Sequence, residues 1–168
     1  MNKLIIPFII LFAALSRLIP HPPNFTPIIA MGIFGGIYMK DYRQALLIPL
    51  CGMFFSDLIL GYHGMIPWVY LSLILITHIG TRLKSKVNFV NCTASIIGGS
   101  LLFFLISNFG VWFIGGYENS ISGLIICYTM AIPFFHNTLA GSAVYGAIMF
   151  GGYEALKHYN QGSIPDSI

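Results

Sequence analysis

Residues 90–109 read VNCTASIIGGSLLFFLISNF, a run of twenty residues without a charged side chain. The hydrocarbon core of a bilayer is about 30 Å thick, and an α-helix needs about 20 apolar residues to cross it. Of the 168 residues in the chain, 57% are hydrophobic and only 8% are charged. A soluble domain carries roughly 25% charged residues, so this chain lacks the polar side chains to cover a surface in water. The run 90–109 is therefore predicted to be one transmembrane helix of an integral membrane protein.

Further apolar segments lie on both sides of this run. With it they predict six spans, at about residues 4–19, 28–39, 44–60, 66–83, 90–109 and 137–156. The segment 121–132 is also apolar, but Pro133 and the polar pair His136-Asn137 separate it from the last span, since proline breaks a helix. We expect it to form a short, partly inserted helix. The predicted fold is a single all-α domain over residues 1–168, a membrane bundle of about six transmembrane helices.

Basic residues predict the orientation of the bundle. Cytoplasmic loops of membrane proteins carry an excess of Lys and Arg. Six alternating spans place seven of the eight basic residues on one side, and only Arg17 lies at the other end of a span. The seven are Lys3, Lys40, Arg43, Arg82, Lys84, Lys86 and Lys157. We therefore predict a multi-pass protein of the bacterial cytoplasmic (inner) membrane, with both termini in the cytoplasm.

Polar and aromatic side chains gather at the predicted outer ends of the spans. An ionised group at mid-bilayer costs on the order of 3 kcal/mol on insertion scales, so such groups face a cavity, a partner or the interface. Aromatic faces with a few amides and charges suit a pocket for a flat, polar small molecule. The candidate substrate-binding residues are Asn24, Asp57, His63, Asn108, Trp112, Tyr117, His136 and Asn137.

These residues also allow simpler interpretations. Trp and Tyr collect in belts at membrane interfaces whether or not a ligand is present. Asp57 is equally a candidate for a structural ion pair with Arg17, since both charges lie at a similar depth.

Small residues form a second pattern. Gly32 and Gly36 make a GxxxG motif in the second span, and small side chains repeat at four-residue spacing in the last span, at Ala143, Ala147 and Gly151. Such spacing lets helix backbones approach closely. The pattern predicts close packing within the bundle, or a smooth face that receives a partner membrane subunit.

The sequence contains no motif for catalysis or cofactor binding. HExxH, GxSxG, Walker sequences and paired carboxylates at usable spacing are all absent. The three cysteines are far apart, each inside an apolar run, which indicates packing rather than a metal site: Cys51, Cys92 and Cys127. We expect no enzyme activity, no metal and no cofactor, although Asp57, His63 and His136 leave a membrane-embedded enzyme as a third alternative. The expected partners are the lipid bilayer and a small-molecule substrate, and not nucleic acid.

Three segments carry a resemblance to a known family: residues 17–27 (RLIPHPPNFTP), 56–63 (SDLILGYH) and 107–112 (SNFGVW). They resemble an uncharacterised family of small bacterial integral-membrane proteins labelled as transport proteins, over nearly the whole chain. That family is distantly similar to the S components of energy-coupling-factor (ECF) vitamin transporters. The resemblance implies six spans and a substrate pocket at the outer face, formed by the first, third and fifth loops. It also makes a transmembrane energising subunit with ATPases a candidate partner. The first span departs from the S components, because it lacks their AxxxA pattern.

Together these features predict a membrane protein that binds a small vitamin-like or nucleobase-like molecule at the outer face and takes part in its uptake. The alternative is a structural or assembly subunit of a larger membrane complex, which the small-residue faces and the short loops would suit.

Overall fold

The computed structural model describes residues 4–162, and Lys3 of the basic set lies outside them. Within that range the chain forms helices joined by short turns, with no strand. The elements are α1 (Ile5–Leu15), the 3₁₀ turn η1 (Ser16–Leu18), α2 (Ile28–Tyr38), α3 (Tyr42–Leu60), α4 (Ile66–Arg82), α5 (Phe89–Val111), the π-helical turn η2 (Trp112–Gly116) and α6 (Ile121–Gly162). The predicted all-α class is confirmed for the described residues.

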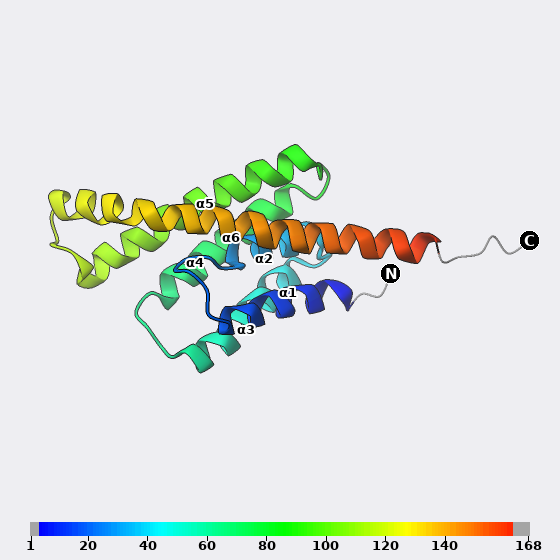
Figure 1. The fold of residues 1–168 in the computed structure, drawn as a ribbon, viewed down its shortest axis with the longest axis horizontal. Coiled ribbons are helices and arrows are strands. Elements are labelled where there is room, and N and C mark those ends of the chain that lie inside the picture. Colours follow the sequence, from blue (N-terminus) through cyan, green and yellow to red (C-terminus); the bar gives the residue numbers. More distant parts are fainter. Residues whose placement is uncertain (1–3, 163–168) are drawn as a thin grey trace, which may run out of the picture.

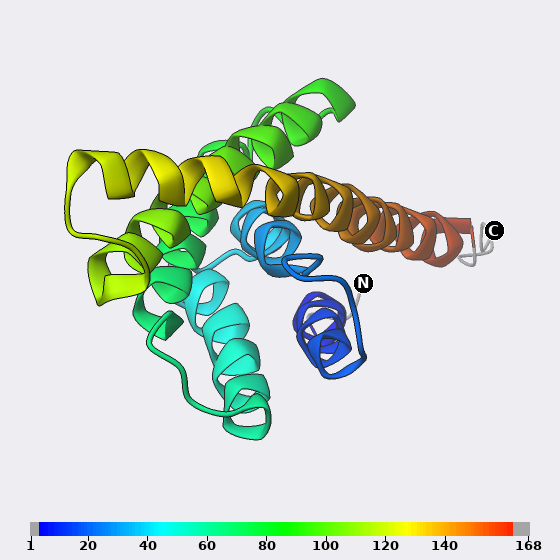
Figure 2. The same cartoon turned by 60° about the vertical axis from the view of Figure 1, so that its left-hand side comes forward.

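Consecutive helices run back and forth along the long axis of the molecule (Figure 1). The first turn of α1 and the last turns of α6 lie at one end, and the α5–α6 hairpin lies at the other. Seen closer to end-on, α2 occupies the middle of the bundle (Figure 2). It contacts each of the five other α-helices. The short second helix is therefore the centre of the fold.

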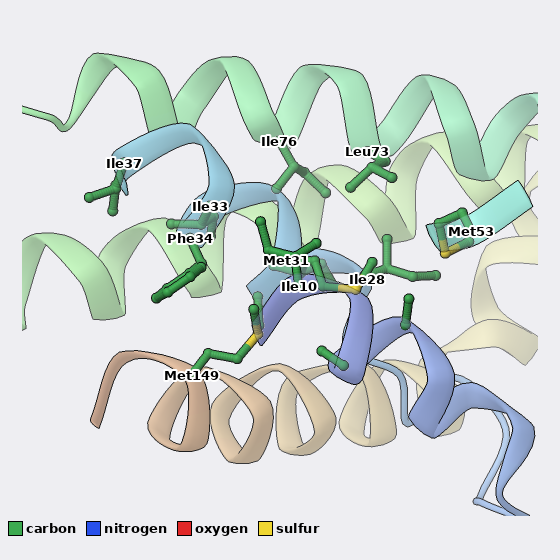
Figure 3. Close-up of a cluster of buried hydrophobic side chains, with 14 of the residues drawn as sticks. Ile10, Ile28, Met31, Ile33, Phe34, Ile37, Met53, Leu73, Ile76 and Met149 are labelled. Carbon is green, nitrogen blue, oxygen red and sulfur yellow. The ribbon is translucent and has the colours of Figure 1, made fainter. Parts of the chain in front are cut away.

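The hydrophobic core is built around α2. Every residue from Ile28 to Ile37 is buried. Side chains from α1, α3, α4 and α6 close around it, among them Ile10, Met53, Leu73 and Met149 (Figure 3). Eleven residues at a rise of 1.5 Å span only about 16 Å, about half of a bilayer core. An element this short and apolar is stable because its neighbours enclose it.

Glycines allow α2 and α4 to pack backbone against backbone. A β carbon on Gly36 would lie 2.8 Å from the Cα of Gly80, and one on Gly80 would lie 2.6 Å from the carbonyl oxygen of Ile33. Real side chains do not approach this closely, so both positions require glycine. The GxxxG spacing of Gly32 and Gly36 therefore serves packing within the bundle, the first of its two predicted uses. The small residues of α6 at 143, 147 and 151 are instead exposed.

The outside of the bundle is apolar, whereas several polar groups are inside. On α3, side chains more than half exposed include Phe54, Phe55, Leu58 and Ile59. Buried hydroxyl groups bond to carbonyls of their own helices, as Thr77 does to Leu73. Within residues 4–162, three helices are long and apolar enough to cross a membrane: Tyr42–Leu60, Phe89–Gly116 and Ile121–Tyr159. This distribution suits a bilayer, where apolar helix surfaces need no water, and it supports a membrane protein.

The last apolar run corrects one prediction. The separate short helix expected over 121–132 is wrong, because α6 continues from Ile121 to Gly162 through Pro133. Proline removes one helix hydrogen bond, but packing can hold such a helix together. Before the proline, the Tyr128 hydroxyl donates to the carbonyl of Leu105 on α5 at 2.7 Å. Beyond it, Ser100 of α5 donates to the Ser142 hydroxyl at 3.2 Å. Since α5 lies against both halves, α6 stays continuous. The other five predicted spans match helices to within two residues, provided that the 3₁₀ turn η1 is counted with α1, which itself ends at Leu15.

Candidate functional site

The two ends of the bundle differ in charge. Among the described residues, all Lys and Arg side chains except Arg17 lie at the end that holds the first turn of α1: Lys40, Arg43, Arg82, Lys84, Lys86 and Lys157. We call this the basic end. The opposite end, formed by residues 19–27, 61–65 and 112–120, is called the distal end. The predicted polar residues lie at or near the distal end.

A buried ion pair joins η1 to α3 at the distal end. The Arg17 Nη1 lies 2.8 Å from Asp57 Oδ1, as the sequence predicted, and Nη1 also donates to the Ser56 hydroxyl. The Tyr70 hydroxyl donates to the second carboxylate oxygen of Asp57 at 2.9 Å. The Asp57 side chain is only 6% exposed, and that of Arg17 is 10% exposed. Both oxygens of Asp57 are thus engaged inside the protein.

Beside this ion pair lies a cavity of about 300 Å³, which we call cavity A. It is enclosed by the turn before α2, the start of α4 and the distal part of α5. Its apolar walls include Ile28, Val69 and Phe103. Its polar lining consists of Arg17, Asn24, Thr26, His63, Ser107 and Asn108.

A second cavity of about 280 Å³, cavity B, lies between the same turn, α5 and α6. Asn24, Asn108 and Val111 line both cavities, so A and B adjoin along these three residues. Tyr117 adds a phenol group to cavity B, and the rest of its lining is mostly apolar. The first and fifth connections of the chain thus meet at one place, together with His63 from the third.

The turn that carries Asn24 is held by its own conformation and by α6. Asn24 has a φ of +64°, a left-handed conformation that Asn adopts more readily than most residues. The Asn137 amide donates to the carbonyl of Pro23 at 3.0 Å. A β carbon on Gly141 would lie 2.9 Å from the backbone nitrogen of Thr26, so α6 packs directly against this turn. These contacts place Asn24 over the two cavities.

The side chain of Asn108, which lines both cavities, is bonded to the protein through its nitrogen alone. Its Nδ2 donates to the carbonyl of Phe104, one turn back on α5, at 2.7 Å. No described residue donates to its Oδ1. A ligand N–H group in cavity A or B would find this oxygen available.

The other predicted site residues lie elsewhere. The Trp112 indole donates to the carbonyl of Glu118 at 3.0 Å and packs on Phe109, outside both linings. His136 is exposed and lines neither cavity. Asn137 bonds α6 to the turn before α2, and Asp57 pairs with Arg17; neither residue lines a cavity. Of the eight predicted residues, the structure brings four to the cavities: Asn24, His63, Asn108 and Tyr117.

Three polar lining residues were not predicted as ligand contacts. Arg17 was predicted only as an ion-pair partner, and Thr26 and Ser107 were not singled out. A helical pattern could have indicated Ser107, because Phe103, Ser107 and Val111 repeat at four-residue spacing on α5 and all line cavity A. Among the described residues, no three His, Cys, Asp or Glu side chains are grouped to hold a metal ion.

The described residues have an apolar outer surface and helices of membrane-spanning length, and they carry one buried ion pair. These features define the class of helical membrane proteins. The chain belongs to a family of unknown function, DUF6580, whose family model matches residues 1–163. No curated protein and no solved structure matches the chain.

Proposed function

We propose that this protein is a six-helix bundle of the bacterial cytoplasmic membrane and captures a small molecule at its outer face for uptake. The observation that carries the proposal is the pair of adjoining cavities at the distal end, with Asn24 and Asn108 between them. Ligand sites are concave, mostly apolar and supplied with a few polar groups. Cavity B has this composition, and cavity A joins apolar walls to a larger polar set, six of its eleven lining residues. The proposed role is binding and transport without catalysis.

The orientation follows from the charges. The basic end is proposed to face the cytoplasm, because Lys and Arg are retained there. The distal end then opens toward the outside, where a nutrient would arrive. Each cavity is at the lower limit of the range of about 300–1,000 Å³ for small-molecule sites. A vitamin-like or nucleobase-like molecule, with a flat ring and a few polar atoms, suits this size and lining.

The resemblance to ECF S components supports the same arrangement, since it implies a pocket formed by the first, third and fifth loops. Residues from these three connections line cavities A and B. A transmembrane energising subunit with ATPases is a proposed partner, because the chain carries no nucleotide-binding motif of its own.

A second candidate function is that of an assembly subunit in a larger membrane complex. One observation favours it: Ala143, Ala147 and Gly151 form an exposed row of small residues on α6, and a β carbon on Gly151 would meet nothing within 4 Å. This surface could receive another transmembrane helix. If the protein captures a ligand, a small molecule should co-purify with it; if it is an assembly subunit, another protein should.

Native mass spectrometry of the gently solubilised protein separates them. We expect a small molecule to remain bound to the wild type and to be lost or strongly depleted in Asn108→Ala. His136→Ala is the matched control, because His136 is exposed near the same end and lines neither cavity; it should retain the ligand. Equal loading of the wild type and Asn108→Ala would refute capture in these cavities. A stoichiometric protein partner with no small molecule would favour the assembly function.

A further inference from the structure

We infer that the ligand of cavity A is an electrically neutral molecule that presents an amide, lactam or imide group to Arg17 and Asn108. This inference rests on the proposed function and adds the chemical class of the ligand.

Two of the three guanidinium nitrogens of Arg17, Nε and Nη2, form no hydrogen bond within the described part of the protein. A guanidinium group has five N–H donors on three nitrogens. Only Nη1 has partners among the described residues, Ser56 and Asp57. Yet no buried side-chain nitrogen or oxygen in the described part of the chain lacks a partner. Nε and Nη2 must therefore be accessible, and Arg17 lines cavity A while its side chain is 90% buried overall. Since Arg17 lines cavity A, these two donor nitrogens are assigned to a ligand in the cavity.

The charges around cavity A favour a neutral ligand. The positive charge of Arg17 is already balanced by Asp57 at 2.8 Å. Arg17 is the only Lys, Arg, Asp or Glu side chain in the lining of cavity A, and the one other titratable group there is His63. A cationic ligand would meet no free carboxylate, because both Asp57 oxygens are engaged. An anionic ligand would bring an unbalanced charge to a partly buried, neutral site, which is costly.

A neutral carbonyl avoids this cost and still receives charge-assisted hydrogen bonds from the guanidinium. Asn108 supplies the complementary group, since its Oδ1 accepts an N–H. An adjacent C=O and N–H pair on the ligand would therefore satisfy both side chains. The apolar walls at Ile28, Val69 and Phe103 leave room for the flat ring to which such a group is attached.

Benzamide and benzoate provide the test, because they have the same size and shape and differ in charge. The full-length wild type in detergent is melted with increasing amounts of each compound at pH 7 and constant ionic strength. A bound ligand raises the melting temperature in a saturable manner. We expect benzamide to do so with an apparent affinity at least tenfold higher than that of benzoate. Equal responses, no response to either compound, or a preference for benzoate would overturn the inference.

Asp57→Asn sharpens the test by leaving the Arg17 charge unbalanced. The variant should reverse the preference, with benzoate binding at least tenfold more tightly than benzamide. Lys157→Gln, which changes one charge at the basic end, should bind like the wild type. A folded Asp57→Asn protein that still prefers benzamide would contradict the charge argument. If this variant does not fold, the relative affinities of benzamide and benzoate for the wild type test the inference.

The proposed function and this inference can fail separately. An anionic molecule that co-purifies with the wild type and is lost from Asn108→Ala would refute the neutral ligand class and support capture. If no molecule co-purifies and neither compound binds, both are refuted.

Discussion

The side-chain amide of Asn137 on α6 donates a hydrogen bond of 3.0 Å to the carbonyl oxygen of Pro23, in the turn before α2. The two residues are 114 positions apart in the chain. This bond ties the last helix to the turn that carries Asn24 over both cavities. Asn137, predicted to bind substrate, thus holds in place the turn that carries Asn24, another predicted site residue.

Asn137→Ala should loosen the distal turn. A hydrogen bond of this kind contributes about 1 kcal/mol, so the amides of Phe25 and Thr26 should exchange with deuterium about fivefold faster. These amides bond within the turn, to Pro22 and Asn24, and report its opening. Hydrogen exchange followed by mass spectrometry measures the effect. His136→Ala, at the exposed neighbouring position, should leave the exchange unchanged; equal acceleration in both variants would show that the bond does not hold the turn.

Loss of either partner of the Arg17–Asp57 ion pair should destabilise the fold. Each of Asp57→Asn and Arg17→Gln leaves a buried group without its partner, at a cost on the order of 3 kcal/mol. The double variant should lose less than the sum of the single losses by at least about 1 kcal/mol. Unfolding in mixed detergent micelles gives the free energies.

The Lys157–Glu154 pair provides the control for that cycle. Both of its side chains are more than 40% exposed, so Lys157→Gln should cost less than about 1 kcal/mol. Strict additivity of the Arg17 and Asp57 losses would mean that the two charges do not stabilise each other.

Gly36→Ala should lower the free energy of unfolding by about 3 kcal/mol, near the top of the range for overpacking. The added β carbon would meet the backbone of Gly80 at 2.8 Å, and a backbone cannot turn aside as a flexible side chain does. Gly98→Ala is the matched control, because nothing lies within 4 Å of a β carbon there. Thermal unfolding should show the loss only in Gly36→Ala, and equal melting temperatures would contradict the close α2–α4 contact.

Cysteine labelling tests the proposed orientation. Ser85 and Asn119 are exposed and lie at the basic end and the distal end, respectively. A cysteine at each position is introduced into a variant from which the three native cysteines have been removed. A membrane-impermeant maleimide should label Asn119→Cys in intact cells and Ser85→Cys only after the cells are permeabilised. The reverse pattern would invert the topology.

Helix positions could be predicted because they depend on local composition. An apolar segment between charged or proline-rich turns has few conformations other than a helix in a bilayer, since every backbone group must find a partner inside the segment. The helices over the first five predicted spans were accordingly located to within two residues, provided that η1 is counted with α1. Pro133 misled the prediction because its effect depends on packing against α5, where Leu105 and Ser100, more than 20 residues earlier in the chain, bond to α6 on either side of the proline.

The helical class, the apolar outer surface and the separation of basic residues from the distal polar groups could be inferred from the sequence, because they depend on which residues stand in each segment. Which polar groups meet depends on how the helices pack. Asn24 and His63 come from two different connections and Asn108 from α5, and the three share one cavity, whereas Trp112 and His136 occupy the same end and remain outside it. Depth along a helix can be counted from the sequence, but the direction in which a side chain points depends on the rotation of its helix against its neighbours. Packing around the enclosed α2 sets that rotation.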